Sequence, residues 1–224
     1  MGNWRQCAGR RAYTGNRVAP KGTGPTPHPE PPDDLHSRTI PLLTTQQSWT
    51  RIFRRQQAPL YFGWSPDRRF DPPTRVYRVL YVAADVHGAF IETLGYQTGI
   101  RLVTTSALQS RGVAILRSRA PLRLVDLTAA GLAQIGADER LCAGEYTIAQ
   151  RWSLALFRHP AKPDGLYYRS RHDPSRMCAA IFHRAARKVT VEHHSALTDP
   201  QLGSVLAEIL NTYHFGHIDD ADEP

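Results

Sequence analysis

The most constraining stretch of this sequence runs from Tyr77 to Gly95, where one hydrophobic period gives way to another. In YRVLYVAA, residues 77–84, the side chains alternate between two faces with the two-residue period of a half-buried strand. Asp85 is a favourable helix N-cap, and the apolar residues after it share one helical stripe until Gly95. The stretch predicts a strand joined directly to a short helix, and therefore a fold that combines sheet and helix.

Further short strands and isolated helices are predicted along the chain. Strand patterns lie at residues 100–104, 113–116, 122–127, 165–170, 177–183 and 189–192, and helical patterns at 128–135, 144–159 and 199–213. Strands 165–170 and 177–183 flank a polar turn and are expected to pair. Because no repeat is visible and the elements do not alternate regularly, we expect the α+β (mixed α/β) class and a single compact domain.

The two ends of the chain differ from this regular part. Residues 1–46 include the run GTGPTPHPEPPDD and show neither period, so we expect a disordered, Pro/Gly-rich extension that is dispensable for folding. Residues 47–217 form the predicted domain. Residues 218–224 are acidic and are expected to stay solvated as a short tail.

Composition limits the class of protein. The chain has 224 residues, and its 41% hydrophobic content is enough to bury a core. No apolar run approaches the roughly 20 residues of a membrane helix, and no apolar block follows the N-terminal charges. We therefore expect a cytoplasmic protein without a membrane segment. Cys7, Cys142 and Cys178 are odd in number and far apart, which favours neither a disulfide framework nor a zinc site.

The net charge of +8 raises nucleic acid as a partner. However, 3 of the 28 Lys and Arg residues are lysine, and the arginines are spread along the whole chain rather than grouped. A non-catalytic, basic nucleic-acid-binding module therefore stands as an alternative, and direct nucleic-acid contact is not expected. His193 and His194 are adjacent on a predicted strand and would point to opposite faces, so we expect no metal.

Four short motifs occur in a fixed order: WTRIFRR (49–55), GWSPDRRFDPP (63–73), LYVAADVHGAFIETL (80–94) and LYYRSRHDP (166–174). Together they resemble the RES domain family, the toxin component of bacterial RES/Xre toxin–antitoxin pairs, and the resemblance spans about residues 49–185. Asp71 stands where asparagine is commoner in that family. The family is similar in fold to ADP-ribosyltransferases and degrades NAD⁺. The resemblance thus implies an ADP-ribosyltransferase-like domain with NAD⁺ as its substrate.

The resemblance carries five residues over to this chain. Arg51 matches an arginine in an aromatic-x-Arg-aliphatic segment, and Arg69 matches one in an Arg-aromatic-Asn/Asp-Pro-Pro turn. Tyr81 matches the tyrosine of an aliphatic-Tyr-aliphatic-Ala strand, and Glu92 matches the glutamate of the helix that follows. Ser170 matches the serine of a Tyr-x-Ser-x-Arg/His-Asp turn. Glu92 and Arg69 are the implied catalytic residues, and Arg51, Tyr81 and Ser170 are implied to bind NAD⁺.

These residue types suit the implied chemistry. Breaking the nicotinamide–ribose bond creates an oxocarbenium-like charge, which the carboxylate of Glu92 could stabilise. Arg51 and Arg69 offer planar forks for pyrophosphate and ribose oxygens, and the ring of Tyr81 can stack on nicotinamide. The hydroxyl of Ser170 could reach a phosphate or ribose oxygen. Considered alone, the same residues would be an exposed glutamate, solvated arginines, a core tyrosine and a serine in a local turn.

The implied function is that of a toxin that cleaves NAD⁺ with phosphate or water as the acceptor, and without a metal. A protein ADP-ribosyltransferase is the alternative among enzymes. The implied partner is an Xre-like antitoxin in a hetero-oligomer, which would supply any contact with DNA. The acceptor, the oligomeric state, the existence of a cognate antitoxin, the role of the extension and the roles of Arg171 and His172 stay open.

Overall fold

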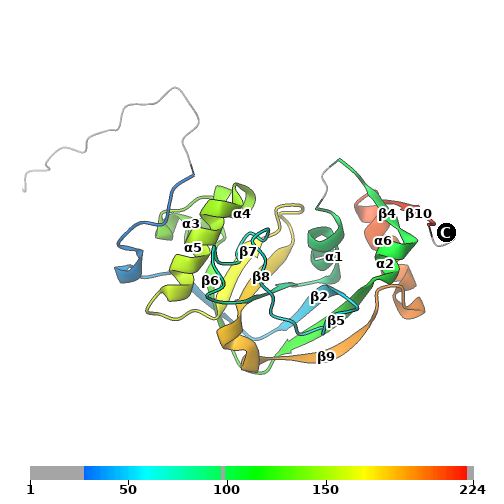
Figure 1. Ribbon diagram of the computed structural model, residues 1–224, viewed down its shortest axis with the longest axis horizontal. Helices are drawn as coiled ribbons and strands as arrows, with labels where there is room; N and C mark the ends of the chain where they lie inside the picture. Colours follow the sequence, from blue (N-terminus) through cyan, green and yellow to red (C-terminus); the bar gives the residue numbers. More distant parts are fainter. Residues whose placement is uncertain (1–27, 97–98, 221–224) are drawn as a thin grey trace, which may run out of the picture.

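The computed structural model describes residues 28–96 and 99–220, and an eight-stranded sheet forms its centre (Figure 1). In spatial order, the strands are β1 (Leu42–Thr45), β6 (Leu122–Asp126), β7 (Gly165–Arg169), β8 (Met177–Phe182), β3 (Val79–Ala83), β2 (Ser48–Arg54), β5 (Arg111–Ser118) and β9 (Val189–Ala196). A two-stranded sheet pairs β10 (Gly216–Ile218) with β4 (Leu102–Thr104). The helices are α1 (Val86–Leu94), α2 (Thr105–Gln109), α3 (Ala129–Ile135), α4 (Arg140–Ala143), α5 (Tyr146–Arg158) and α6 (Gly203–Thr212), with short 3-10 helices at Leu35–Ser37, His183–Lys188 and Pro200–Leu202.

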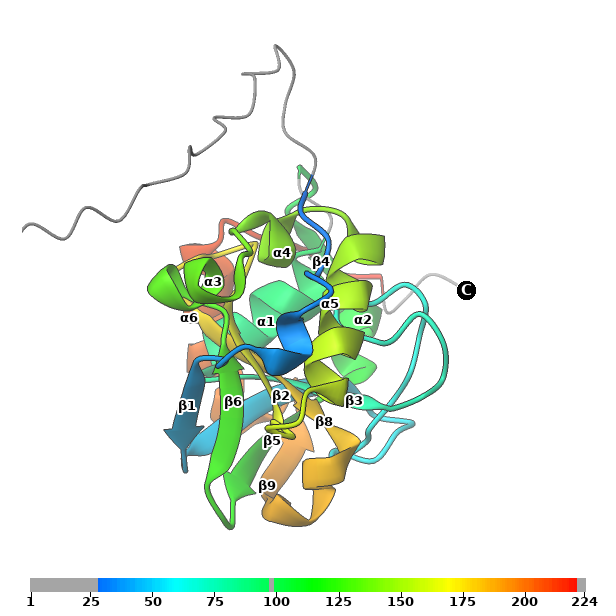
Figure 2. The ribbon, with the colours of Figure 1, turned by 90° about the vertical axis from the view of Figure 1, so that its left-hand side faces the viewer.

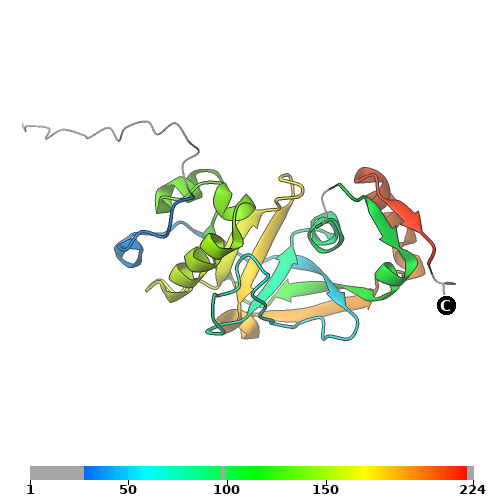
Figure 3. The same cartoon turned by 45° about the horizontal axis from the view of Figure 1, so that its top comes forward.

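The large sheet is mixed and curled. Its neighbouring strands run antiparallel, except that β6 and β7 are parallel. Helices α3, α4 and α5 lie to one side of α1, whereas α2, α6 and the small sheet lie to its other side (Figures 1 and 3). This arrangement confirms the predicted α+β class.

The predicted strand and helix around Asp85 are confirmed. Strand β3 ends at Ala83 and α1 begins at Val86, and the carboxylate of Asp85 accepts a hydrogen bond from the backbone N–H of Gly88 at 2.7 Å. This cap satisfies one of the N–H groups that the first turn of a helix leaves unpaired. The helix ends at Gly95, as the pattern predicted.

Strand β3 is buried on both faces of the sheet. Val79 and Ala83 face the larger cluster of buried side chains, which includes Phe90 and Ile91 of α1. Leu80 and Val82 face a second cluster on the opposite side of the sheet. A central strand packed on both sides holds its position firmly, so the start of α1 is fixed by the core.

The other predicted elements are present with altered lengths. The strand pair around the polar turn is confirmed as β7 and β8, which pair antiparallel. The predicted helix at 199–213 is divided into the 3-10 helix Pro200–Leu202 and α6. Strand β9 continues four residues beyond its predicted end at Glu192, and β2 and β1 were not predicted as strands. Strand β2 was singled out only as a motif, because both of its faces mix apolar with polar side chains: Ser48 and Arg54 share a face with Ile52, and Arg51 lies between Trp49 and Phe53.

The predicted domain boundary at residue 46 is wrong for residues 28–46, the part of the extension that the structure describes. Leu35 and Ile40 are only 3% and 6% exposed within the larger core cluster. Strand β1 pairs antiparallel with β6, and Figure 2 shows the two side by side. The indole N–H of Trp152 on α5 donates to the carbonyl of Pro29 at 2.8 Å. Proline-rich composition obscured this docking, because only a few apolar residues produce it. Residues 1–27 lie outside the described part.

The predicted boundary at residue 217 is also too early. Ile218 is the last residue of β10, and the carboxylate of Asp220 accepts hydrogen bonds from the N–H and hydroxyl of Ser106 at 2.8 and 2.6 Å. These contacts attach residues 218–220 to the start of α2. The rest of the predicted acidic tail, residues 221–224, lies outside the described part.

Two further observations concern the class of protein. Among the described residues, no helix combines the length and the apolar character needed to cross a membrane. Cys142 and Cys178 are buried free thiols, and Cys7 falls outside the described residues.

Candidate functional site

Glu92 and Ser170 are in direct contact. The hydroxyl of Ser170 donates to Oε1 of Glu92 at 2.6 Å, and Ser170 is 1% exposed. The same hydroxyl oxygen accepts the backbone N–H groups of His172 and Asp173 at 3.1 and 3.2 Å. A hydroxyl has one proton to donate and two lone pairs, so these three bonds use all of its capacity. Ser170 therefore orients the carboxylate of Glu92, a role that was not predicted.

The sheet explains why these two residues meet. Glu92 lies on α1, which leaves the end of β3, and Ser170 directly follows the end of β7. Strand β8 lies between β3 and β7, and its first residues pair with both: Cys178 with Ala83, and Met177 with Arg169. The turn from β7 to β8 and the start of α1 therefore lie at the same end of the strands.

Arg69 is a buried cation with one unused donor group. It is 8% exposed, its Nη1 donates to the carbonyl of Gly144 at 2.7 Å, and its guanidinium lies 4.4 Å from the ring centroid of Tyr146. Its Nη2 is buried and has no hydrogen-bond partner among the described residues. Burial lowers the pKa of Arg69, and the positive charge of Arg171 adds to this shift. An unpaired buried donor is costly, so Nη2 is well suited to an incoming acceptor oxygen.

A side chain of helix α5 holds the loop that carries Arg69. Gln150 is buried, and its amide donates to the carbonyls of Pro66 and Arg68 at 2.6 and 2.9 Å. A buried glutamine in an amphipathic helix could have indicated such a contact, because buried amides require partners.

Tyr81 is fixed through its hydroxyl. This group donates to Oδ1 of Asp71 at 2.7 Å and accepts from the backbone N–H of Phe70 at 3.0 Å, so Tyr81 is anchored to the residues that follow Arg69. Burial, together with the charge of Asp71, raises the pKa of Tyr81 well above its usual value. Its ring remains partly accessible, with the guanidinium of Arg68 at 5.5 Å from its centroid.

Asp71 is fully buried and serves the same turn. Its second carboxylate oxygen accepts from the backbone N–H of Ser65 at 2.6 Å. Burial raises the pKa of Asp71, although the hydrogen bonds from Tyr81 and Ser65 oppose that shift. The carboxylate thereby joins the two ends of the loop to strand β3.

Arg51 is not brought into contact with Glu92. It lies on β2 between Trp49 and Phe53, which belong to the cluster on the sheet face opposite α1. Its Nη1 donates to the carbonyl of Tyr61 at 2.8 Å. Burial, and then the charge of Arg68, lowers the pKa of Arg51 to about 10. No hydrogen bond joins Arg51 to the other four predicted residues.

His172 has Glu92 and several arginines among its charged neighbours. Burial lowers the pKa of His172, the nearby carboxylate of Glu92 opposes this shift, and the charges of Arg171, Arg101 and Arg69 reinforce it. The Nε–H of Arg171 donates to Nε2 of His172 at 3.2 Å, which requires a ring nitrogen without a proton. No firm role was predicted for Arg171 and His172. Their position directly after Ser170 was the available signal.

A cavity of about 450 Å³ opens beside Ser170. The turn contributes Arg169, Ser170 and Arg171, and α3, α4 and the loop between them contribute mostly apolar side chains. Cys142 lines its wall, and burial raises the pKa of this thiol to about 12, with opposing effects from Arg69 and Glu92. The thiol is therefore protonated at neutral pH and is no nucleophile.

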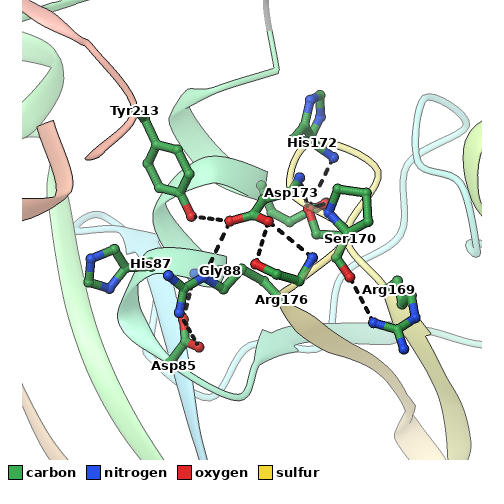
Figure 4. Close-up of polar contacts among 12 residues, drawn as sticks. Asp85, His87, Gly88, Arg169, Ser170, His172, Asp173, Arg176 and Tyr213 are labelled. Carbon is green, nitrogen blue, oxygen red and sulfur yellow. Dashed lines mark hydrogen bonds and ion pairs between the residues drawn. The ribbon is translucent and has the colours of Figure 1, made fainter. Parts of the chain in front are cut away.

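A group of polar residues ties the turn to two helices (Figure 4). The carboxylate of Asp173 accepts from the hydroxyl of Tyr213, which directly follows α6, at 2.8 Å and from Nε of Arg176 at 3.3 Å. Nη1 of Arg176 reaches the carboxylate of Asp85 at 3.1 Å. None of these four residues was predicted as part of the site.

Within the described ranges, no three His, Cys, Asp or Glu side chains gather as a metal site. The fold and the site thus define a mixed α/β protein in which Ser170, in the wall of a cavity, orients the carboxylate of Glu92. The sequence model of the RES domain matches residues 43–200, well over half of the chain, and the chain belongs to the RES domain family.

One curated protein and one solved structure are similar to this chain. The "Probable toxin y4kH" of Sinorhizobium fredii (strain NBRC 101917 / NGR234) is 31% identical over 107 residues, which cover 47% of this chain and 82% of that protein. A chain in the crystal structure of the M. tuberculosis MbcT–MbcA toxin–antitoxin complex matches with a TM-score of 0.62 and 12% identity. That match covers 80% of this chain and 97% of the other and shows a shared fold.

Proposed function

We propose that the protein is a toxin of a toxin–antitoxin system that cleaves the nicotinamide–ribose bond of NAD⁺ and transfers ADP-ribose to phosphate or water. The observation that carries the proposal is the hydrogen bond from Ser170 to Glu92. It holds one carboxylate oxygen in place, so the other oxygen, Oε2, can face a ribose whose charge develops as nicotinamide leaves.

The neighbouring groups fit the rest of the substrate. The unpaired Nη2 of Arg69 can donate to a pyrophosphate or ribose oxygen. The ring of Tyr81, held by its hydroxyl, is a flat surface for nicotinamide, and the exposed side chain of Arg68 would move aside from it. Arg51 lies on the other face of the sheet and donates to the carbonyl of Tyr61, so we assign it no direct contact with the substrate.

A protein partner is also part of the proposal. The M. tuberculosis structure that shares the fold is named as a toxin–antitoxin complex. By analogy, an Xre-like antitoxin would bind this chain and restrain its activity, and the excess positive charge would favour an acidic contact surface on that partner.

The deciding experiment is incubation of the purified protein with NAD⁺, with and without phosphate, followed by identification of the products by mass. We expect nicotinamide together with ADP-ribose or its 1-phosphate. The matched control is Glu92→Gln, which keeps the shape but removes the charge. Its turnover should fall about a hundredfold, a loss typical of one preorganised electrostatic contact, with an unchanged melting temperature. ADP-ribose found attached to a protein would instead support ADP-ribosyl transfer. Wild-type turnover in Glu92→Gln would contradict the role of Glu92.

A further inference from the structure

The carboxylate of Asp173 joins three separate segments of the chain. It is carried by the turn between β7 and β8, it accepts from the hydroxyl of Tyr213 at 2.8 Å, and it contacts Arg176, which reaches Asp85 at the start of α1. Figure 4 shows Asp173 between Tyr213 and Arg176, with Asp85 beside the arginine. We name Asp85, Asp173, Arg176 and Tyr213 the clamp.

The clamp acts on the two segments that supply Glu92 and Ser170. The backbone N–H of Asp173 donates to the hydroxyl oxygen of Ser170 at 3.2 Å, so a shift of Asp173 would move that hydroxyl. Asp85 caps the helix that carries Glu92. Glu92 and Ser170 are thus connected twice, once directly and once through the clamp.

The charge states support these contacts at neutral pH. Burial would raise the pKa of Asp173, but hydrogen bonds from Ser175, Tyr213 and Arg176 outweigh it and lower the pKa. Burial, together with the hydrogen bond to Asp173, raises the pKa of Tyr213 to about 12. Asp173 is therefore an ionised acceptor and Tyr213 a protonated donor, a combination stronger than a neutral pair.

Tyr213 also contacts helix α1. Its ring packs edge-on against His87 with 6.2 Å between the centroids, and His87 lies 3.6 Å from the carboxylate of Glu208 on α6. The end of α6 is consequently placed by α1 as well as by the turn. The RES domain match ends at residue 200, so Tyr213 lies outside the matched part of the chain.

We propose that Tyr213 is a positioning residue: through Asp173 it fixes the turn that holds Ser170 against Glu92, and so makes the segment after residue 200 part of the site. The kinetic consequence rests on the proposed NAD⁺ cleavage. The structural consequence, an ordered turn at residues 170–176, does not depend on it.

The test variant is Tyr213→Phe, which removes one hydroxyl and leaves the ring. The matched control is Tyr167→Phe on β7, since Tyr167 packs with the cluster on the other face of the sheet. Hydrogen–deuterium exchange should show faster exchange at residues 170–176 in Tyr213→Phe alone, because the amides of His172 and Asp173 lose their fixed acceptor. Unchanged exchange there would overturn the proposal, whatever the activity.

Kinetics supply the second readout. In Tyr213→Phe, kcat for NAD⁺ cleavage should fall about tenfold while KM stays within about twofold, because the substrate-binding Arg69 is unaffected. A raised KM with an unchanged kcat would overturn the positioning role. If the wild-type protein does not cleave NAD⁺, the proposed function fails, and the exchange experiment alone decides whether Tyr213 orders the turn.

Discussion

Ser170 directs its single hydroxyl proton to the carboxylate of Glu92, a residue 78 positions earlier in the chain, at a distance of 2.6 Å. The two side chains therefore behave as one unit. A substitution of Ser170 changes how the carboxylate is oriented, and a substitution of Glu92 removes its charge, so the two effects can be measured separately.

Ser170→Ala should leave Glu92 charged but unoriented. We expect kcat for NAD⁺ cleavage to fall at least tenfold, and stability to fall by about 1–3 kcal/mol because the N–H groups of His172 and Asp173 lose their acceptor. Steady-state kinetics and urea denaturation measure the two effects. Ser118→Ala is the matched control, since this buried serine accepts from the indole of Trp49 at 3.1 Å. It should lose stability but keep its kcat, and an equal loss of kcat in both variants would remove Ser170 from the site.

Arg69→Lys should weaken NAD⁺ binding more than folding. The guanidinium of Arg69 contacts the carbonyl of Gly144 through Nη1 and keeps Nη2 available for the substrate. Lysine keeps the positive charge but loses this two-pronged geometry. We expect KM to rise about tenfold, and melting curves will show whether the fold is retained. Arg75→Lys is the control, because this exposed arginine lies over the ring of Trp64. A KM for Arg69→Lys that equals that of the control would exclude Arg69 from substrate binding.

Asp71→Asn should change how stability depends on pH. Burial raises the pKa of Asp71 above its ordinary value of 3.8. The folded protein then binds this proton more tightly than the unfolded chain, so stability is lost as pH rises from about 4 through the folded-state pKa. Asparagine does not titrate, so the free energy of unfolding of the wild type, relative to Asp71→Asn, should decrease over that interval. Urea denaturation between about pH 4 and pH 8 measures the difference. A pH-independent difference would show that Asp71 titrates normally.

Leu35→Ala should destabilise the domain by about 2–3 kcal/mol, because the side chain is 3% exposed in the main core cluster and its loss leaves a cavity. Leu102→Ala, at a leucine that is 53% exposed, is the matched control and should change stability by about 0.5 kcal/mol or less. Equal stability of the two variants would mean that the burial of Leu35 contributes nothing to folding.

Local patterns predicted those parts of the fold whose cause is local. Strand β3, its cap Asp85 and helix α1 follow from periodicity and capping, which act over a few residues. Strand β1 does not, because its pairing with β6 depends on a partner about 80 residues away and on the burial of Leu35 and Ile40. Composition cannot reveal such a contact.

The site was predictable to a similar extent. The family motifs identified Glu92 and Ser170, and these two meet. The same motifs could not show that the hydroxyl of Ser170 donates to Glu92, or that Arg51 lies on the other face of the sheet. Tyr213 was missed because its role depends on where the C-terminal helix packs, which no local pattern records.

Strand β1 also keeps the edge of β6 from pairing with strands of other molecules. It covers the outer edge of β6, whose residues Leu122, Leu124 and Val125 are completely buried. A chain shortened to begin at residue 47 would leave the backbone N–H and C=O groups of that edge unpaired, next to an apolar surface. Such edges pair readily with strands of other molecules. Removing a segment that looks like a dispensable extension would therefore be expected to cause self-association, even where the catalytic residues remain intact.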